Sequence, residues 1–86
     1  MSDGAIENEV LDRCSDDIEA PHSIAPDISR DLGRLVTETE VRAAFLALAS
    51  KGLVQAYIFE VASSRYVPIS SAEATHTDAA WFMAKK

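Results

Sequence analysis

The chain of 86 residues carries 8 Lys and Arg against 14 Asp and Glu, a formal net charge of -6, and 48% of its residues are hydrophobic. So short a chain predicts one small domain over residues 1–86. Its one cysteine excludes an intrachain disulfide, and no Cys/His grouping offers the ligands of a zinc site, so we expect no metal or cofactor. We also expect a cytoplasmic protein, because the longest apolar run, 43–49, is too short to span a membrane and the start lacks signal-peptide features.

The acidic residues are concentrated in the first half of the chain. Residues 1–40 hold eleven acids and three bases, a sum of -8, whereas residues 41–86 hold three acids and five bases, a sum of +2. A nucleic-acid binder usually presents a basic stripe, so this composition leans against DNA binding. The seven acids before residue 20 are expected on the solvated face of a helix: Asp3, Glu7, Glu9, Asp12, Asp16, Asp17 and Glu19.

Apolar spacing predicts a first helix over about residues 4–17. Its stripe contains Ile6, Val10, Leu11, Cys14 and Ile18. On this stripe Cys14 is interpreted as a small buried hydrophobe, because no neighbour in the sequence would activate its thiol.

Two prolines frame the expected start of the second helix. Pro21 and the segment 21–25 are predicted to be extended and to break the first helix, and Pro26 suits a first helical position. The second helix is therefore predicted from Pro26 to Gly33, with Ile28 and Leu32 on its inner face.

The third helix, predicted from about Glu38 to Lys51, has the strongest local signals. Thr37 and Glu40 form the pattern of a capping box, and Gly52 stands where a C-terminal cap belongs. Its predicted buried stripe is Val41, Ala44, Phe45 and Leu48.

Strands are predicted after this helix. Residues 53–61 are rich in β-branched and aromatic side chains, 78–84 have a similar character, and Pro68 limits the shorter segment 65–69 to a sheet edge. The connection 70–77 is small and polar, and we expect it to be mobile. His76, Asp78, Ser70 and Ser71 lie in or beside it, where rigid positioning for catalysis is not expected, so no enzyme is predicted.

Two segments and the strand after them resemble the winged helix-turn-helix domain of bacterial transcriptional regulators. They are Ile-Ser-Arg-Asp-Leu-Gly (28–33) and Glu-Val-Arg-Ala-Ala-Phe-Leu-Ala-Leu-Ala-Ser-Lys-Gly-Leu-Val (40–54), with Trp-Phe-Met (81–83) as the returning wing strand. The resemblance covers residues 6–84 and implies an α+β fold of three helices followed by a β-hairpin wing. It also implies a transcriptional regulator that binds double-stranded DNA. We expect such a regulator to act as a dimer, because one small module rarely reads enough base pairs for useful specificity. By position, the base-facing residues would be Thr37, Glu38, Thr39, Arg42 and Ala43, and the phosphate contacts Arg30, Arg34, Lys51 and Arg65.

Two departures from that family pattern favour a protein partner. The segment 26–52 holds four acids and four bases, so its net charge is zero. Opposite its buried stripe the third helix places Leu46 and Ala47, which suit a protein contact, although Leu46 would equally fit under a neighbouring loop or be a lone exposed leucine. An interaction module without DNA binding is the alternative function, with a second copy or another protein as partner. Its interface would comprise Leu46, Ala47, Tyr57, Phe59 and Trp81, with Phe82 as a further aromatic candidate.

Overall fold

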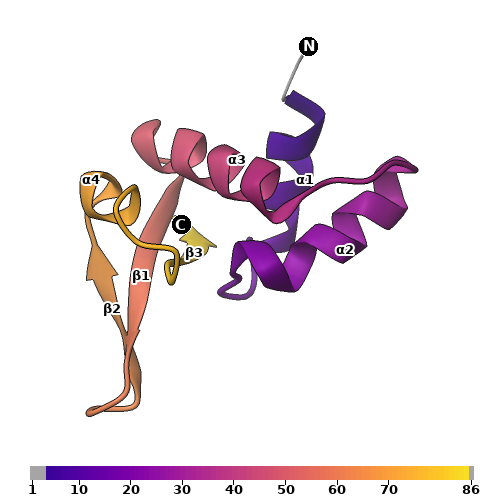
Figure 1. Cartoon of the computed structure of the whole chain (residues 1–86). Coiled ribbons are helices and arrows are strands. Elements are labelled where there is room, and N and C mark those ends of the chain that lie inside the picture. The colour runs from indigo at the N-terminus through magenta and orange to yellow at the C-terminus, as the bar shows by residue number, and fades with distance from the viewer. Residues whose placement is uncertain (1–3, 86) are drawn as a thin grey trace.

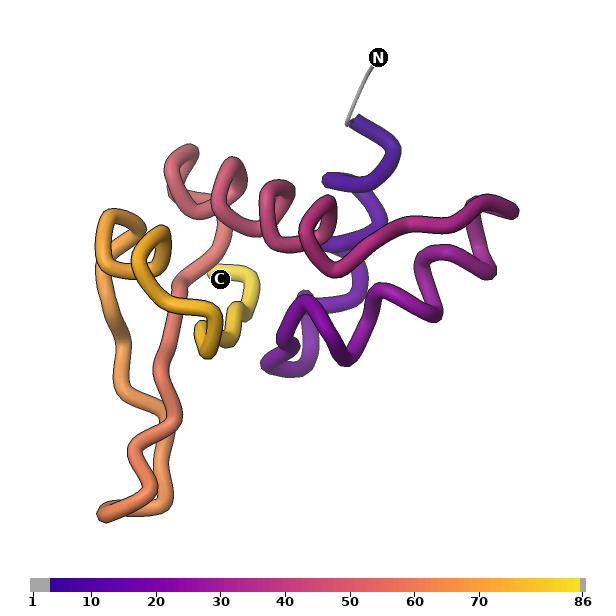
Figure 2. The backbone as a smooth tube through the Cα atoms, in the orientation of Figure 1, coloured from indigo at the N-terminus to yellow at the C-terminus, as the bar shows by residue number. Residues whose placement is uncertain are grey.

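The computed structural model describes residues 4–85. Its elements, in chain order, are α1 (Gly4–Arg13), α2 (Pro21–Leu32), α3 (Glu38–Ser50), β1 (Val54–Glu60), β2 (Arg65–Ile69), α4 (Ser71–Ala74) and β3 (Trp81–Ala84). The first three helices gather at one end, and the hairpin of β1 and β2 projects away from them (Figures 1 and 2). The predicted α+β class, three helices followed by a β-hairpin, is confirmed.

Helix α1 is shorter than predicted. Ile6, Val10 and Cys14 are buried as the apolar stripe indicated, but the helix ends at Arg13. The chain then becomes extended at Glu19, whose N–H and C=O bond the backbone of Phe82 at 2.8 and 2.7 Å. Residues 15–17, Ser-Asp-Asp, compete with a helix through their side chains, and the Ser15 hydroxyl donates to the Asp12 carbonyl at 2.7 Å. Asp3 lies outside the described residues.

The predicted start of α2 is wrong by five residues. The helix begins at Pro21, and the segment 21–25 is helical instead of extended. Pro21 occupies the first helical position, where its missing N–H costs nothing, and the Ser23 hydroxyl accepts from the N–H of Ala20 at 3.1 Å. Pro26 therefore lies inside the helix. The predicted end holds, because Gly33 has a left-handed backbone with φ of 69°.

Helix α3 matches its prediction closely. The Thr37 hydroxyl accepts from the N–H of Glu40 at 3.2 Å, and the Glu40 carboxylate accepts from the N–H of Thr37 at 3.1 Å. At the other end Gly52 has a φ of 78°, and the N–H of Leu53 donates to the Leu48 carbonyl at 3.0 Å. This is a Schellman ending, so both ends of the helix are fixed by local chemistry.

The sheet is antiparallel in the order β2-β1-β3. The third strand is shorter than the predicted 78–84 and begins at Trp81. The connection expected to be mobile contains α4, which is capped by Ser70 and Glu73 and places Ala74 in the core. This helix, which a second capping box begins, was not predicted from the sequence, and the expected mobility of the segment stays a prediction.

The core lies between the helices and the inner face of the sheet. Its largest side chains, Phe45 of α3 and Phe82 of β3, stack with ring centroids 4.4 Å apart. Val54 and Ala56 of β1 add to it from the same face of the sheet as Phe82. Within residues 4–85 no helix has the length and apolar character that crossing a membrane would require.

Candidate functional site

The N-terminal half of α3 forms an exposed face with little basic character. Thr37, Glu38, Thr39 and Ala43 are all exposed. The Thr37 hydroxyl, predicted to face bases, already serves the capping box. The hydrogen bond from the Thr37 N–H, with help from the nearby Arg34 guanidinium, lowers the pKa of the Glu40 carboxyl below its ordinary value. Glu40 therefore remains an anion beside the predicted DNA face.

The side chains predicted to meet phosphates on the helices are already paired with carboxylates. Arg30 lies 2.6 Å from Asp27, Arg34 lies 3.6 Å from Glu40, and Lys51 lies 3.0 Å from Glu7, measured between nitrogen and oxygen atoms. Arg65, at the hairpin tip, has no ion pair among residues 4–85. Three of the four predicted phosphate contacts are thus neutralised within the chain.

Arg42 points along the protein surface toward α4. Its guanidinium donates to the carbonyl oxygens of Ala74, Thr75 and Thr77 at 3.3, 3.1 and 3.0 Å, and its Nε lies 3.9 Å from Asp78. These carbonyls belong to the end of α4 and to the residues after it, where few backbone N–H groups remain to bond them: the Ala74 carbonyl also accepts from the Thr77 N–H at 3.5 Å. Arg42 therefore acts as a cap for α4, and base contact would require breaking this arrangement.

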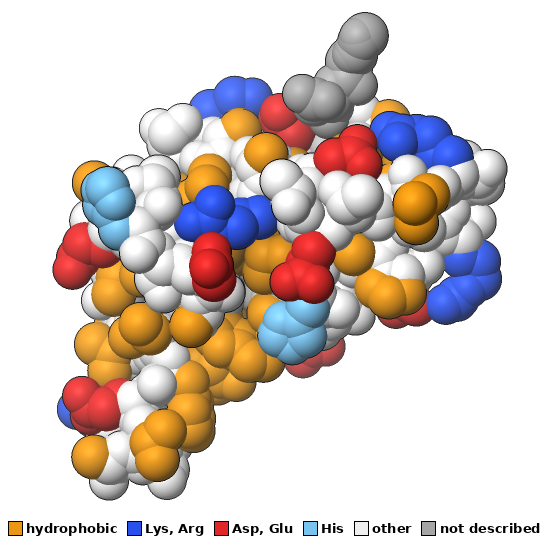
Figure 3. Space-filling view, viewed as in Figure 1, with side chains coloured by type: hydrophobic (Ala, Val, Ile, Leu, Met, Phe, Trp, Pro, Cys, Tyr) orange, Lys and Arg blue, Asp and Glu red, His pale blue; other side chains and the backbone are white. Residues whose placement is uncertain are grey.

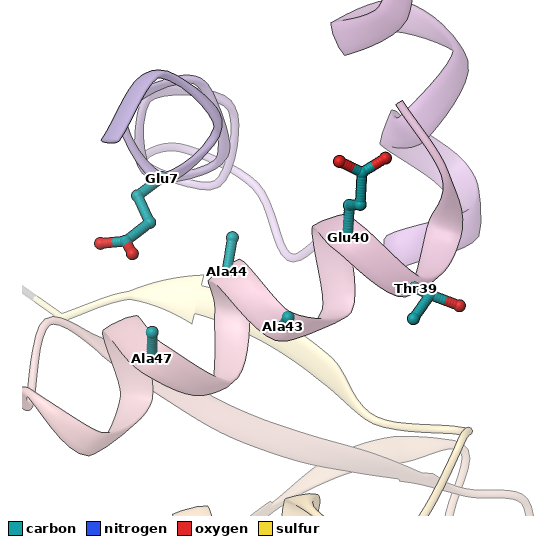
Figure 4. A pocket seen from close by; sticks show the side chains of 6 residues that line it. All are labelled: Glu7, Thr39, Glu40, Ala43, Ala44 and Ala47. Atoms are coloured by element: carbon teal, nitrogen blue, oxygen red, sulfur yellow. The ribbon is translucent and has the colours of Figure 1, made fainter. Parts of the chain in front are cut away.

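Leu46 and Ala47 lie on α3 in different surroundings. Leu46 is half-buried and packs against the core cluster, so the prediction that it faces away from the core is wrong. Ala47 lines a shallow pocket of about 260 Å³ between α1 and α3, together with Glu7, Thr39, Glu40, Ala43 and Ala44. Figure 4 shows Glu7 extending from α1 beside the small side chains of α3. Acidic groups lie at both ends of this pocket, which makes it unsuited to phosphate.

The outer face of the sheet is aromatic and carries no charged side chain on its strands. Successive side chains of a strand point to opposite faces of the sheet. Because Ala56 of β1 and its partner Phe82 of β3 are buried on the inner face, the residues next to each of them along their strands face outward. Tyr57 is opposite Trp81 and Pro68, and Phe59 is opposite Tyr66. We call Tyr57, Phe59, Tyr66 and Trp81 the aromatic face. Figure 3 shows hydrophobic side chains gathered along the hairpin, whereas most charged side chains lie over the helices.

Rings on this face form a connected row. His22 meets Trp81, Trp81 meets Tyr66, and Tyr66 meets Phe59, each edge to face, with centroids 5.9, 5.5 and 5.1 Å apart. The sequence indicated Tyr57, Phe59 and Trp81 but not Tyr66 or His22. The alternation of Tyr66 and Pro68 around Val67 was the available signal for Tyr66, whereas His22 joins the row only through the fold. Phe82, also considered for an interface, is buried in the core.

No protein-family model, curated protein or solved structure matches this chain. Among residues 4–85 no group of three or more His, Cys, Asp or Glu side chains is placed to hold a metal ion.

Proposed function

We propose that this chain is a winged-helix domain that binds protein and not DNA. The order of three helices, hairpin and returning strand is compatible with a winged helix. The observation that carries the proposal is the pairing of Arg30, Arg34 and Lys51 with carboxylates on the surface that would meet a duplex.

Electrostatics explain why this pairing matters. Non-specific DNA affinity comes from cations that neutralise phosphates and release counterions. Exposed ion pairs are weak, at about 0 to 1 kcal/mol, so each cation is free to swing away from its partner. The carboxylates of Asp27, Glu40 and Glu7 would nevertheless remain next to the phosphates and repel them. With a formal net charge of -6 for the chain, no long-range attraction offsets that repulsion.

A titration of random duplex DNA at low and at moderate salt tests the proposal. We expect no saturable binding by the wild type at either salt concentration. As a matched control, the double variant Glu7→Gln, Asp27→Asn releases Lys51 and Arg30, and it should bind DNA measurably at low salt only. Tight wild-type binding with a steep salt slope, weakened by Arg30→Ala and Lys51→Ala, would show that the proposal is wrong.

A DNA-binding transcriptional regulator is the second candidate. The exposed N-terminal half of α3 and the projecting hairpin support it, and Arg65 remains without an ion pair within the described part of the chain. If the hairpin contacts phosphate, Arg65→Ala should reduce the salt slope of duplex binding by about one. An unchanged slope would remove the hairpin from the DNA interface.

A further inference from the structure

We infer that the aromatic face of the sheet is a two-fold interface between copies of this chain. The inference rests on the proposed protein-binding function and names its partner. Phe59 is 41% exposed and Tyr66 is 38% exposed, although both are large ring side chains, and Tyr57 and Trp81 beside them are half-buried. Large aromatic side chains left in contact with water on one contiguous face are typical of an interface.

The rings are held in place before a partner arrives. Each ring in the row from Phe59 through Tyr66 to Trp81 contacts the next edge to face, and Trp81 also meets His22 at the start of α2. Rings on paired strands that already restrain one another lose little side-chain freedom on association. This arrangement is therefore ready to pack against a second apolar surface.

The distribution of charge selects a second copy as the occupant. The outward residues of the three strands are Gln55, Tyr57, Phe59, Tyr66, Pro68, Trp81 and Met83, and none of them is charged. The excess acid lies in residues 1–40, with a sum of -8, whereas residues 41–86, which contain the sheet together with α4 and most of α3, sum to +2. Two copies that meet through their sheets keep their acidic helices apart. An uncharged face complements itself, as a two-fold contact requires.

Pro68 favours face-to-face packing over pairing between strand edges. It lies on β2, the outer strand of the hairpin, where an added strand would need backbone N–H groups as donors. Proline has no N–H, so this edge is a poor template for a further strand. The side chains of the aromatic face, and not the backbone edge, would therefore make the contact.

Sedimentation of the full chain over a range of concentrations, at low and moderate salt, tests the inference. We expect a monomer–dimer equilibrium in which added salt strengthens the dimer, because salt screens the repulsion between two chains of net charge -6. DNA binding would weaken with salt instead. Trp81 is the chain's single tryptophan, so its fluorescence emission should shift to shorter wavelength as the protein is concentrated.

Matched substitutions locate the interface. Phe59→Lys should raise the dimer dissociation constant at least about tenfold by burying an unpaired charge. Leu35→Lys is the control, since Leu35 is 79% exposed on the α2–α3 connection and should leave the dimer unchanged. Tyr66→Lys is a second, independent variant in case Phe59→Lys does not give the wild-type circular dichroism spectrum.

Two outcomes would overturn the inference. A wild type that stays monomeric at the highest concentration reached would do so, and so would a dimer that tolerates both lysine variants of the aromatic face. Either result leaves the proposed function standing if duplex DNA is still not bound. DNA binding by the wild type would instead contradict the proposed function, whatever the oligomeric state.

Discussion

Cys14 is a buried thiol at the end of the stripe on α1. It has no exposed surface, its Sγ lies 3.6 Å from the Leu11 carbonyl oxygen, and burial raises its pKa to about 11. The reactive species of cysteine is the thiolate, which this environment disfavours. The sequence-based interpretation of Cys14 as a packed hydrophobe agrees with this burial.

Cys14 should therefore react slowly while the chain is folded. We expect alkylation by iodoacetamide at neutral pH to be at least about 100-fold slower than in the urea-unfolded chain. Because the folded pKa is raised from 9.0 to about 11, the stability linked to this thiol is present below pH 9 and lost as the pH rises through 11. Comparing the pH dependence of unfolding in wild type and Cys14→Ala isolates this contribution. Equal labelling rates in the folded and unfolded chains would contradict the assignment.

The short helix α4 depends on a side chain from another element. Its N-terminus is capped locally by Ser70 and Glu73, but its C-terminal carbonyls bond the guanidinium of Arg42 on α3. A helix of four residues has almost no stability of its own, because fixing the backbone of the first turn costs more free energy than its few hydrogen bonds contribute. The cap from Arg42 and the buried Ala74 are what hold it in place.

Arg42→Ala should loosen α4 without disturbing α3. We expect a loss of about 1 to 3 kcal/mol, since the half-buried contacts to the Ala74 and Thr77 carbonyls and the exposed contact to the Thr75 carbonyl lose a charged donor. Hydrogen exchange at the amides of residues 73–77 should accelerate at the same time. Arg30→Ala is the matched control, because Arg30 is 70% exposed and its loss should cost less than about 0.5 kcal/mol. Unchanged protection in α4 would show that its cap lies elsewhere.

The helices differ in how far their bounds could be predicted. Both ends of α3 were predicted because its caps are made by residues within a few positions of each end. The start of α2 was missed because Pro21 and Pro26 satisfy the same local rule, and only the tertiary fold decides between them. The capping box of α4, Ser70 with Glu73, repeats the pattern of Thr37 with Glu40, so the start of this helix could have been predicted from the sequence. The polar, small composition around it concealed the signal.

The candidate site was less predictable than the fold. Strand character and aromatic side chains indicated Tyr57, Phe59 and Trp81 as candidates, but the register that brings Tyr66 opposite Phe59 follows from the turn and from packing. The engagement of Arg42 joins residues 32 to 35 positions apart. A helical pattern shows where such a side chain starts and cannot show which distant carbonyls it meets.

At the scale of the whole molecule, one stacked ring pair joins the helical layer to the sheet. Phe45 of α3 and Phe82 of β3 are almost fully buried and nearly parallel, with an interplanar angle of 11°. A domain of this size has a small free energy of unfolding, so the loss of one central ring destabilises the whole domain.

Phe45→Ala should cost about 3 to 5 kcal/mol and unfold a large fraction of the molecules at room temperature. Thermal unfolding followed by far-ultraviolet circular dichroism measures the change. Phe59→Ala, a substitution of the same kind at a 41% exposed position, should cost far less and serves as the control. Similar melting temperatures for the Phe45 variant and the wild type would mean that this ring pair is not central to the core.

The pairing of Glu19 with Phe82 has a consequence for biosynthesis. This bridge and the hydrogen bond from the Ala84 N–H to the Cys14 carbonyl, at 3.0 Å, tie the segment after α1 to the strand that is translated last among these elements. A nascent chain lacking residues 81–84 has no ring to stack on Phe45 and leaves an open sheet edge beside β1. The helices therefore emerge from the ribosome with an unfinished core, and the domain closes only after Ala84 has left the exit tunnel.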